Sequence, residues 1–181
     1  SDGSKFNTFS PDDVMNGHIS NSKKSSFIVY DDDHFYMASV IAEKLSLDGH
    51  NVIYVTPMPT IATWTDFTLE QSKIIHKFND LKITIKPNIK LKNNGDFVDV
   101  LSDKIEDFSV ENLVIVGARY PNDKVYKQVK KELENKNIYS AGDCVSPGII
   151  QAAVLSGHHI ARKIIDDKKN KKEFFRDQIY N

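Results

Sequence analysis

The sequence has almost no cysteine and no long apolar run. Cys144 is the single cysteine among 181 residues, which excludes an internal disulfide framework and a cysteine-based zinc finger. No apolar segment approaches the ~20 residues of a membrane-spanning helix, and the polar residues 1–5 indicate no signal peptide. Acidic and basic residues nearly balance, 25 against 24, so a basic surface for nucleic acid is not indicated. We therefore expect a cytoplasmic protein that binds neither membrane nor nucleic acid and that has no metal site.

Apolar patterning predicts an α/β fold with a parallel sheet. Short continuous apolar runs are typical of buried parallel strands, and they occur at 27–30, 52–55, 83–85 and 113–116. Apolar residues at helical spacing predict helices before Gly49, over about 66–81, over about 123–135 and over about 148–166. A period-two pattern around Asn93-Asn94-Gly95 predicts an antiparallel hairpin, because Asn-Gly supplies the positive φ angles of a tight turn. This order is that of a Rossmann-like nucleotide-binding domain with an antiparallel hairpin crossover.

The pattern divides the chain into four parts. Residues 1–25 form a linker with a short helix that begins after Ser10. Residues 26–137 form an NAD(P)-binding-like Rossmann domain. Residues 138–167 form a C-terminal arm, with a strand at 138–141 followed by a helix, and 168–181 form a polar tail.

The turn after the first parallel strand, residues 31–38, contains no glycine. A dinucleotide-binding turn needs glycine so that the pyrophosphate can approach the helix N-terminus. Here Asp31, Asp32 and Asp33 place like charges where the phosphates would lie, and two such charges ~4 Å apart repel by ~1 kcal/mol even in bulk water. The acid that usually binds ribose is also missing after the second strand, which ends in Val55-Thr56-Pro57. We therefore expect that this domain does not bind NAD in the standard way.

The three aspartates allow two other interpretations. They resemble the magnesium-binding acids of a response-regulator receiver, but the third strand leads into Lys86-Pro87 rather than into a phosphate-accepting aspartate. The favoured interpretation is structural: the carboxylates cap the helix that follows, and His34 is a loop residue rather than a ligand. No catalytic residue is assigned.

Several motifs resemble the trimethylamine dehydrogenase family, which includes dimethylamine and histamine dehydrogenases and 2,4-dienoyl-CoA reductase. Gly117 to Asn122 is similar to the segment that closes the nicotinamide-nucleotide domain of flavoprotein reductases, and Gly142-Asp143 is similar to their second flavin-domain motif. His34 stands where close relatives often carry glycine. The resembling segments are Asp31–Ala38, Ala42–Leu45, Gly49–Val52, Trp64–Glu70, Pro121–Asp123, Gly142–Cys144 and Gly157–Arg162.

The resemblance implies a C-terminal fragment of a multidomain flavin and iron–sulfur oxidoreductase. Such a parent holds FMN and a 4Fe-4S cluster with an N-terminal barrel, binds ADP or FAD, and demethylates small methylated amines oxidatively. Residues 138–167 would complete its flavin/ADP domain, with Gly142, Asp143 and Ile150 at the cofactor and Asp143 accepting hydrogen bonds from its hydroxyls. Partners would be the remaining parent domains, an electron-transfer protein and a possible second copy. This chain alone would hold no cofactor and be inactive. The alternative is an active NAD(P)H-binding reductase domain.

Overall fold

The computed structural model describes residues 5–19, 24–117, 119–133 and 136–167. The chain separates into two compact units, unit 1 (Ser1–Ala118) and unit 2 (Arg119–Asn181), and each is described by itself. The finer four-part division stays a prediction, and the predicted polar tail 168–181 lies outside the described residues.

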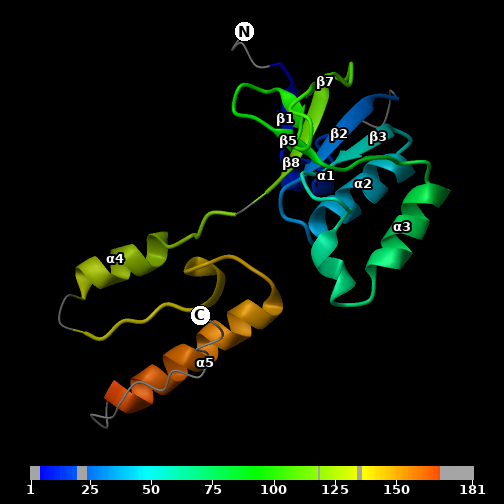
Figure 1. The fold of residues 1–181 in the computed structure, drawn as a ribbon. Helices are drawn as coiled ribbons and strands as arrows, with labels where there is room; N and C mark the ends of the chain where they lie inside the picture. The colour runs from blue at the N-terminus through cyan, green and yellow to red at the C-terminus, as the bar shows by residue number, and fades with distance from the viewer. Residues whose placement is uncertain (1–4, 20–23, 118, 134–135, 168–181) are drawn as a thin grey trace. The chain divides into compact units, whose positions relative to one another are not determined.

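A parallel five-stranded sheet forms the centre of unit 1 (Figure 1). Its order is β1 (Asn7–Phe9), β8 (Asn112–Val116), β2 (Ser26–Asp31), β3 (Asn51–Val55) and β4 (Thr84–Lys86). Every neighbouring pair is parallel. The predicted α/β class with a parallel sheet is confirmed, whereas β1 was not predicted.

A separate antiparallel sheet is formed by the segment of the chain between β4 and β8. It pairs β5 (Ile89–Leu91) with β6 (Phe97–Asp99), and β6 with β7 (Ile105–Glu106). Gly95 in the β5–β6 turn has φ +83°, the conformation that glycine adopts without a steric cost. The predicted hairpin is confirmed, and β7 extends it by a strand that the sequence did not indicate.

Three helices of unit 1 are α1 (Pro11–Met15), α2 (Met37–Leu47) and α3 (Gln71–Asp80). The Ser10 hydroxyl accepts from the Asp13 backbone N–H and the Asp13 carboxylate accepts from the Ser10 N–H, which confirms the predicted start of α1. The helix predicted over 66–81 begins later, at Gln71. Leu69 has φ +60°, which a right-handed helix does not allow, and a short 3-10 helix, η1 (Thr63–Asp66), precedes it.

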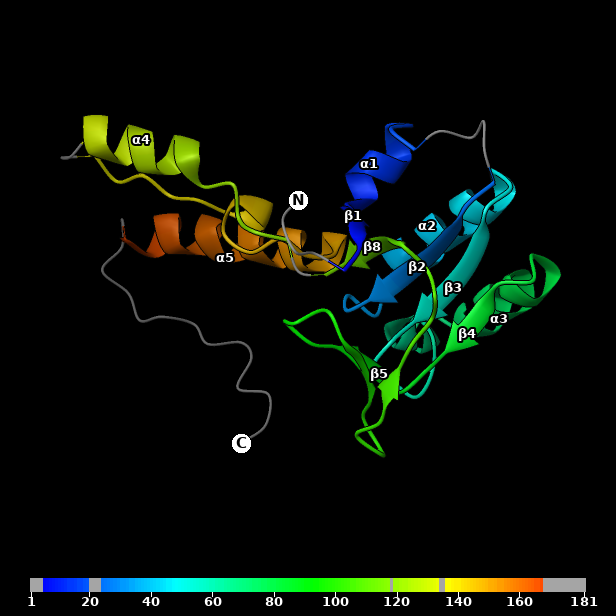
Figure 2. The ribbon, with the colours of Figure 1, turned by 90° about the horizontal axis from the view of Figure 1, so that it is seen from above.

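Alternation along β2 gives the parallel sheet two buried faces. Phe27 and Val29 belong to one apolar cluster with residues of α2 and α3, and Ile28 and Tyr30 belong to another with the antiparallel sheet. Helices α2 and α3 lie along the sheet when the unit is seen from above (Figure 2). Burial on both faces is what a parallel sheet requires.

Unit 2 contains α4 (Lys124–Glu132), the short 3-10 helix η2 (Gly142–Cys144) and α5 (Ile150–Asp167). The helix of the predicted C-terminal arm is confirmed, beginning at Ile150. The strand predicted over 138–141 is wrong, because these residues pair with no strand in the described parts of the chain and a strand needs a hydrogen-bonded neighbour. Of the helices described, none has the length and apolar character to cross a membrane.

Candidate functional site

The candidate site lies at the carboxyl ends of β2 and β8. The chain runs from β2 outward to β3 on one side, while β8 pairs with β2 on the other, so the strand order changes direction between them. Open α/β sheets bind ligands at such a switch point. Asp31 lies opposite Val116 in the register, and the Asp32 backbone N–H donates to the Val116 carbonyl at 2.7 Å.

Asp31 is fully buried and has its carboxylate hydrogen-bonded inside the protein. Its Oδ1 accepts from the backbone N–H of His34 at 2.8 Å and of Asp33 at 3.2 Å, and its Oδ2 accepts from the Tyr54 hydroxyl. Burial raises the pKa of Asp31, and the hydrogen bonds from Tyr54 and His34 oppose that rise. The carboxylate therefore organises its own loop and is not open to a ligand.

The predicted helix capping by the aspartates is wrong. Helix α2 begins at Met37, its N-cap is Tyr36, and that cap has no side-chain hydrogen bond. Asp31 instead bonds two N–H groups of the turn directly after it, as an aspartate does in a tight loop. Asp32 and Asp33 are exposed. The receiver interpretation requires carboxylates open to magnesium, and the burial of Asp31 removes one of them.

His34 takes a backbone conformation that favours glycine. Its φ is +62°, which is uncommon for a residue with a Cβ atom. Its ring is 17% exposed, and Nδ1 lies 3.9 Å from Asp31 Oδ2. The backbone carbonyl of His34 accepts from the Trp64 N–H at 3.0 Å. His34 lies in the loop, as predicted, and it joins this loop to the one after β3.

Tyr54 is the residue of this site that sequence reasoning missed. Its hydroxyl donates to Asp31, and its ring meets the edge of Phe78 at 5.2 Å between centroids. Burial and the neighbouring Asp31 charge raise the pKa of Tyr54 far above its ordinary value, so the hydroxyl keeps its proton. A glycine-free turn and two exposed carboxylates lie where a dinucleotide-binding turn approaches pyrophosphate, and both the bulk of the side chains and their charge oppose it.

The predicted cofactor residues of the C-terminal arm lie at the start of α5. Gly142 has φ +72°, and its N–H donates to Ser156 Oγ of α5 at 2.9 Å. Asp143 is exposed, and its Oδ1 accepts from the Gly148 N–H at 3.4 Å. Ile150, the first residue of α5, is 85% exposed. An exposed carboxylate can accept hydrogen bonds from hydroxyl groups, whereas it repels phosphate.

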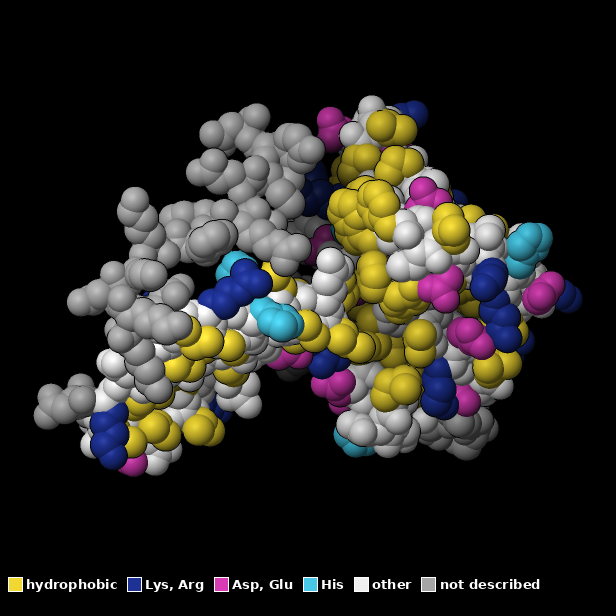
Figure 3. Space-filling view, turned by 90° about the horizontal axis from the view of Figure 1, so that it is seen from below, with side chains coloured by type: hydrophobic (Ala, Val, Ile, Leu, Met, Phe, Trp, Pro, Cys, Tyr) yellow, Lys and Arg dark blue, Asp and Glu magenta, His cyan; other side chains and the backbone are white. Residues whose placement is uncertain are grey.

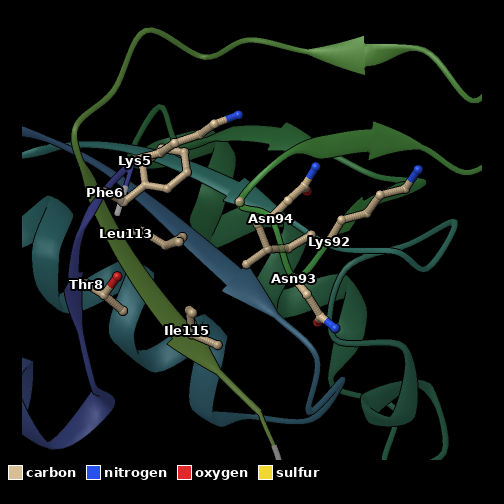
Figure 4. A pocket seen from close by; sticks show the side chains of 10 residues that line it. Lys5, Phe6, Thr8, Lys92, Asn93, Asn94, Leu113 and Ile115 are labelled. Atoms are coloured by element: carbon tan, nitrogen blue, oxygen red, sulfur yellow. The ribbon is translucent and has the colours of Figure 1, made fainter. Parts of the chain in front are cut away.

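Unit 1 also has an open groove of about 670 Å³ (Figure 4). Leu113 and Ile115 of β8 line it, together with Lys5, Phe6 and the turn 93–95. Sequence patterns gave no sign of this groove, because distant segments form it. Within the part of the chain that the structure describes, no group of three or more His, Cys, Asp or Glu residues is placed to hold a metal ion.

Comparison with known proteins finds similarity along most of the chain. Residues 9–93 match the family model described as the OYE-like second alpha/beta domain. Dimethylamine dehydrogenase from Hyphomicrobium sp. (strain x) is 25% identical over 98% of this chain. Histamine dehydrogenase from Rhizobium sp. 4-9 superposes with a TM-score of 0.79 at 26% identity over 96% of this chain. These comparisons show that the chain is similar to flavin oxidoreductases of the trimethylamine dehydrogenase type.

A further solved structure is similar to this chain. The structure of 6-hydroxypseudooxynicotine amine oxidase (HisD) from Pseudomonas geniculata N1 superposes with a TM-score of 0.77 at 27% identity, covering 83% of this chain. The chain spans 28% of the length of the dimethylamine and histamine dehydrogenases and 23% of HisD. The resemblance drawn from the sequence motifs is confirmed, and this chain corresponds to one part of larger flavoenzymes.

Proposed function

We propose that this chain is the nucleotide-binding-like domain and C-terminal arm of an amine-dehydrogenase-type flavoenzyme, and that the domain has an architectural role without nicotinamide nucleotide. The observation that supports this most directly is the buried Asp31 carboxylate. It is bonded to Tyr54 and to its own turn at the place where a dinucleotide-binding domain receives pyrophosphate. The similarity to the OYE-like second alpha/beta domain and to dimethylamine dehydrogenase supports the proposal that the chain is part of a flavoenzyme.

The chemistry of the whole enzyme belongs to parts outside this chain. We propose that these parts oxidise a small methylated amine at FMN, with a 4Fe-4S cluster leading to an electron-transfer protein in the cytoplasm. Supporting this, two of the relatives are named as dehydrogenases of dimethylamine and of histamine. The described residues offer no cysteine set for such a cluster, since Cys144 is the single cysteine.

Binding of nicotinamide nucleotides gives the first test. Calorimetric titration of the chain with NADH, NADPH and ADP is expected to show no binding tighter than about millimolar. The double variant Asp32→Asn/Asp33→Asn removes the exposed charges and is also expected not to bind, because Asp31 and Tyr54 still close the turn. Micromolar affinity of the unmodified chain for NADH would support the alternative, an active NAD(P)H-binding reductase domain.

We also propose that Gly142, Asp143 and Ile150 form one wall of an ADP or FAD site in the complete enzyme. Gly142 lies against α5 without a side chain, where an added Cβ atom would contact Ala153 at 3.9 Å. The exposed Asp143 carboxylate is free to accept hydrogen bonds from ribose or ribityl hydroxyls. When bound, the nucleotide would contact this arm and the neighbouring domain of the complete enzyme, and its binding energy would help to hold the two together.

The second test measures nucleotide content of the complete enzyme. Asp143→Asn is expected to lower the affinity for the adenine nucleotide by about tenfold or more, because a hydrogen bond to a charged group is worth about 1.5–3 kcal/mol. The matched control is Asp123→Asn, which alters the residue before α4. Equal nucleotide content in both variants would contradict the proposed role of Asp143.

Unit 2 offers the surface for its partner domains. None of the described residues of α4 or α5 is buried within the unit, and hydrophobic side chains are visible on its surface (Figure 3). The exposed large apolar residues of α5 and its start are Ile149, Ile150, Val154, Leu155 and Ile165. Such a surface normally lies in an interface. We propose that the remaining domains of the enzyme cover it, with a second copy as the alternative for the isolated chain, and sedimentation equilibrium distinguishes the two.

A further inference from the structure

The loop after β3 presents large apolar side chains to solvent. Trp64 is 45% exposed and Phe67 is 80% exposed, and their rings stack with 5.9 Å between centroids and an interplanar angle of 14°. Leu69, further along the same loop, is 82% exposed. Exposed apolar side chains that gather in one place mark sites of interaction. Trp64, Phe67 and Leu69 are called the apolar patch below.

Hydrogen bonds hold this loop against the turn after β2. The Trp64 backbone N–H donates to the His34 carbonyl at 3.0 Å, and the Tyr36 hydroxyl bonds to Thr68 Oγ1 at 2.8 Å. Thr65 is fully buried, and its hydroxyl donates to a carbonyl of its own loop at 2.7 Å. Because the loop is held in place before anything binds, little conformational entropy is lost when a partner contacts the apolar patch.

The backbone of the two segments is strained at three positions. His34, Ala62 and Leu69 have φ angles of +62°, +44° and +60°, although each carries a Cβ atom. Such conformations cost free energy, and they gather at binding and catalytic sites, where the surrounding structure maintains them. Glycine would relieve the strain, so these conformations point to a role for the loops beyond stability.

The apolar patch lies among negative charges. Asp66 belongs to the same loop, and Asp32 and Asp33 belong to the turn to which that loop is hydrogen-bonded. All three residues are exposed. The two segments, 31–36 and 62–70, contain no lysine or arginine. An occupant of this surface therefore meets aromatic rings and carboxylates together.

This combination discriminates between possible occupants. A nucleic acid or an anionic membrane would bring phosphate groups against the carboxylates, and like charges repel. A purely apolar protein surface would take the carboxylates out of water without compensating them. A small molecule is normally enclosed by its site, whereas the Phe67 ring is 80% exposed and encloses nothing.

We propose that the apolar patch and its carboxylates bind a basic, arginine-bearing segment of a partner protein. The face of an aromatic ring attracts a guanidinium group, and arginine stacks on such a ring more readily than lysine does. The carboxylates of Asp32, Asp33 and Asp66 then pair with further cations of the same segment. Tryptophan and arginine are also among the residues that dominate the energy of protein interfaces. This inference goes beyond the proposed function, because it concerns neither a nucleotide nor a flavin.

Trp64 is the single tryptophan, so its fluorescence reports directly on binding at the apolar patch. The probe is hexa-arginine with blocked termini, titrated into the intact chain at low salt. We expect a saturable change in fluorescence, with binding of hexalysine weaker by about twofold or more and no change with hexaglutamate. Salt at about 0.5 M is expected to weaken the binding, because it screens exposed charges.

Two pairs of variants test the location of the site. Phe67→Ala removes the ring that stacks on Trp64 and is expected to weaken hexa-arginine binding about two- to fivefold. Its matched control is Leu101→Ala, since Leu101 is 79% exposed in the same unit but lies between β6 and β7. Asp66→Asn is expected to weaken binding about twofold, and the control Asp80→Asn, at an exposed residue at the end of α3, is expected to have no effect.

Circular dichroism verifies that each variant is folded, and the pair Phe67→Ala and Leu101→Ala decides if Asp66→Asn is not. The proposal is overturned if hexa-arginine leaves the Trp64 fluorescence unchanged, or if Phe67→Ala and Leu101→Ala bind it equally well. Tetramethylammonium that gave the same change at the same concentration would indicate a site for small cations instead. Self-association of the chain that changes the Trp64 fluorescence in the same way would make the occupant a second copy. Either result contradicts the proposal.

Discussion

Replacing Phe78 with alanine is expected to destabilise unit 1 by about 3–5 kcal/mol, the usual cost of removing a large aromatic side chain from a packed core. Phe78 of α3 is 1% exposed and meets the edge of the Tyr54 ring at 5.2 Å between centroids. It therefore holds α3 on the sheet and also supports the ring whose hydroxyl bonds to Asp31. Urea unfolding followed by Trp64 fluorescence measures the loss, because Trp64 lies in unit 1.

Phe67 supplies the matched control for this substitution. It is the same residue type, eleven residues earlier in the chain, and it is 80% exposed. Phe67→Ala is expected to change the free energy of unfolding by no more than about 0.5 kcal/mol, as surface substitutions usually do. If the two alanine variants unfold at the same urea concentration, α3 does not pack on the sheet as the structure has it.

Patterns local to the sequence were enough to predict the central strands and the hairpin. The runs at 27–30 and 113–116 are apolar on both faces, and that is a property of a buried parallel strand that needs no knowledge of its neighbours. The edge strand β1 has no such run, since Asn7–Phe9 contains one apolar residue. It forms because β8 presents a free edge to it, with Thr8 opposite Leu113. That pairing joins distant segments and leaves no local pattern.

The start of α3 shows a second limit. Helical spacing from Phe67 onward suggested one continuous helix, but Leu69 takes a left-handed conformation and the Tyr36 hydroxyl bonds to Thr68 and Glu70 just before α3. These contacts come from the turn after β2. A helix period read from the sequence does not include such tertiary contacts, so the boundary was placed too early.

The location of the candidate site was predictable, whereas the role of Asp31 was not. The glycine-free turn marked the place, but the carboxylate was expected to cap α2. Strand alternation held the missing signal: Phe27 and Val29 face the core under α2, so Asp31 continues on the same side. Tyr54 lies opposite Val29 in the β2–β3 register, and its hydroxyl reaches Asp31, the next side chain of β2 on the same face. The register between strands, which the sequence alone does not provide, was needed to pair them.

Removing the Tyr54 hydroxyl tests that pairing directly. Tyr54→Phe keeps the ring that packs on Phe78 and deletes the donor to Asp31. At neutral pH we expect a loss of about 1.5–3 kcal/mol in the free energy of unfolding, because a buried charged acceptor loses a hydrogen bond. At acid pH, where Asp31 is protonated in the folded state, the bond is between neutral groups and the loss is expected to be about 1 kcal/mol.

The sign of this pH dependence follows from the two opposing influences on Asp31. Burial raises its pKa, and the Tyr54 hydroxyl, which stabilises the ionised form, holds that rise back. Without the hydroxyl the folded-state pKa rises further, so the loss of stability with rising pH continues to a higher pH in the variant and is larger than in the unmodified chain. Urea unfolding of both proteins at pH 5 and pH 8 measures the difference. Tyr36→Phe is the control, since its hydroxyl bonds to Glu70 at the surface. A loss for Tyr54→Phe that is the same at both pH values, or that Tyr36→Phe reproduces, would show that Tyr54 does not stabilise a buried Asp31 charge.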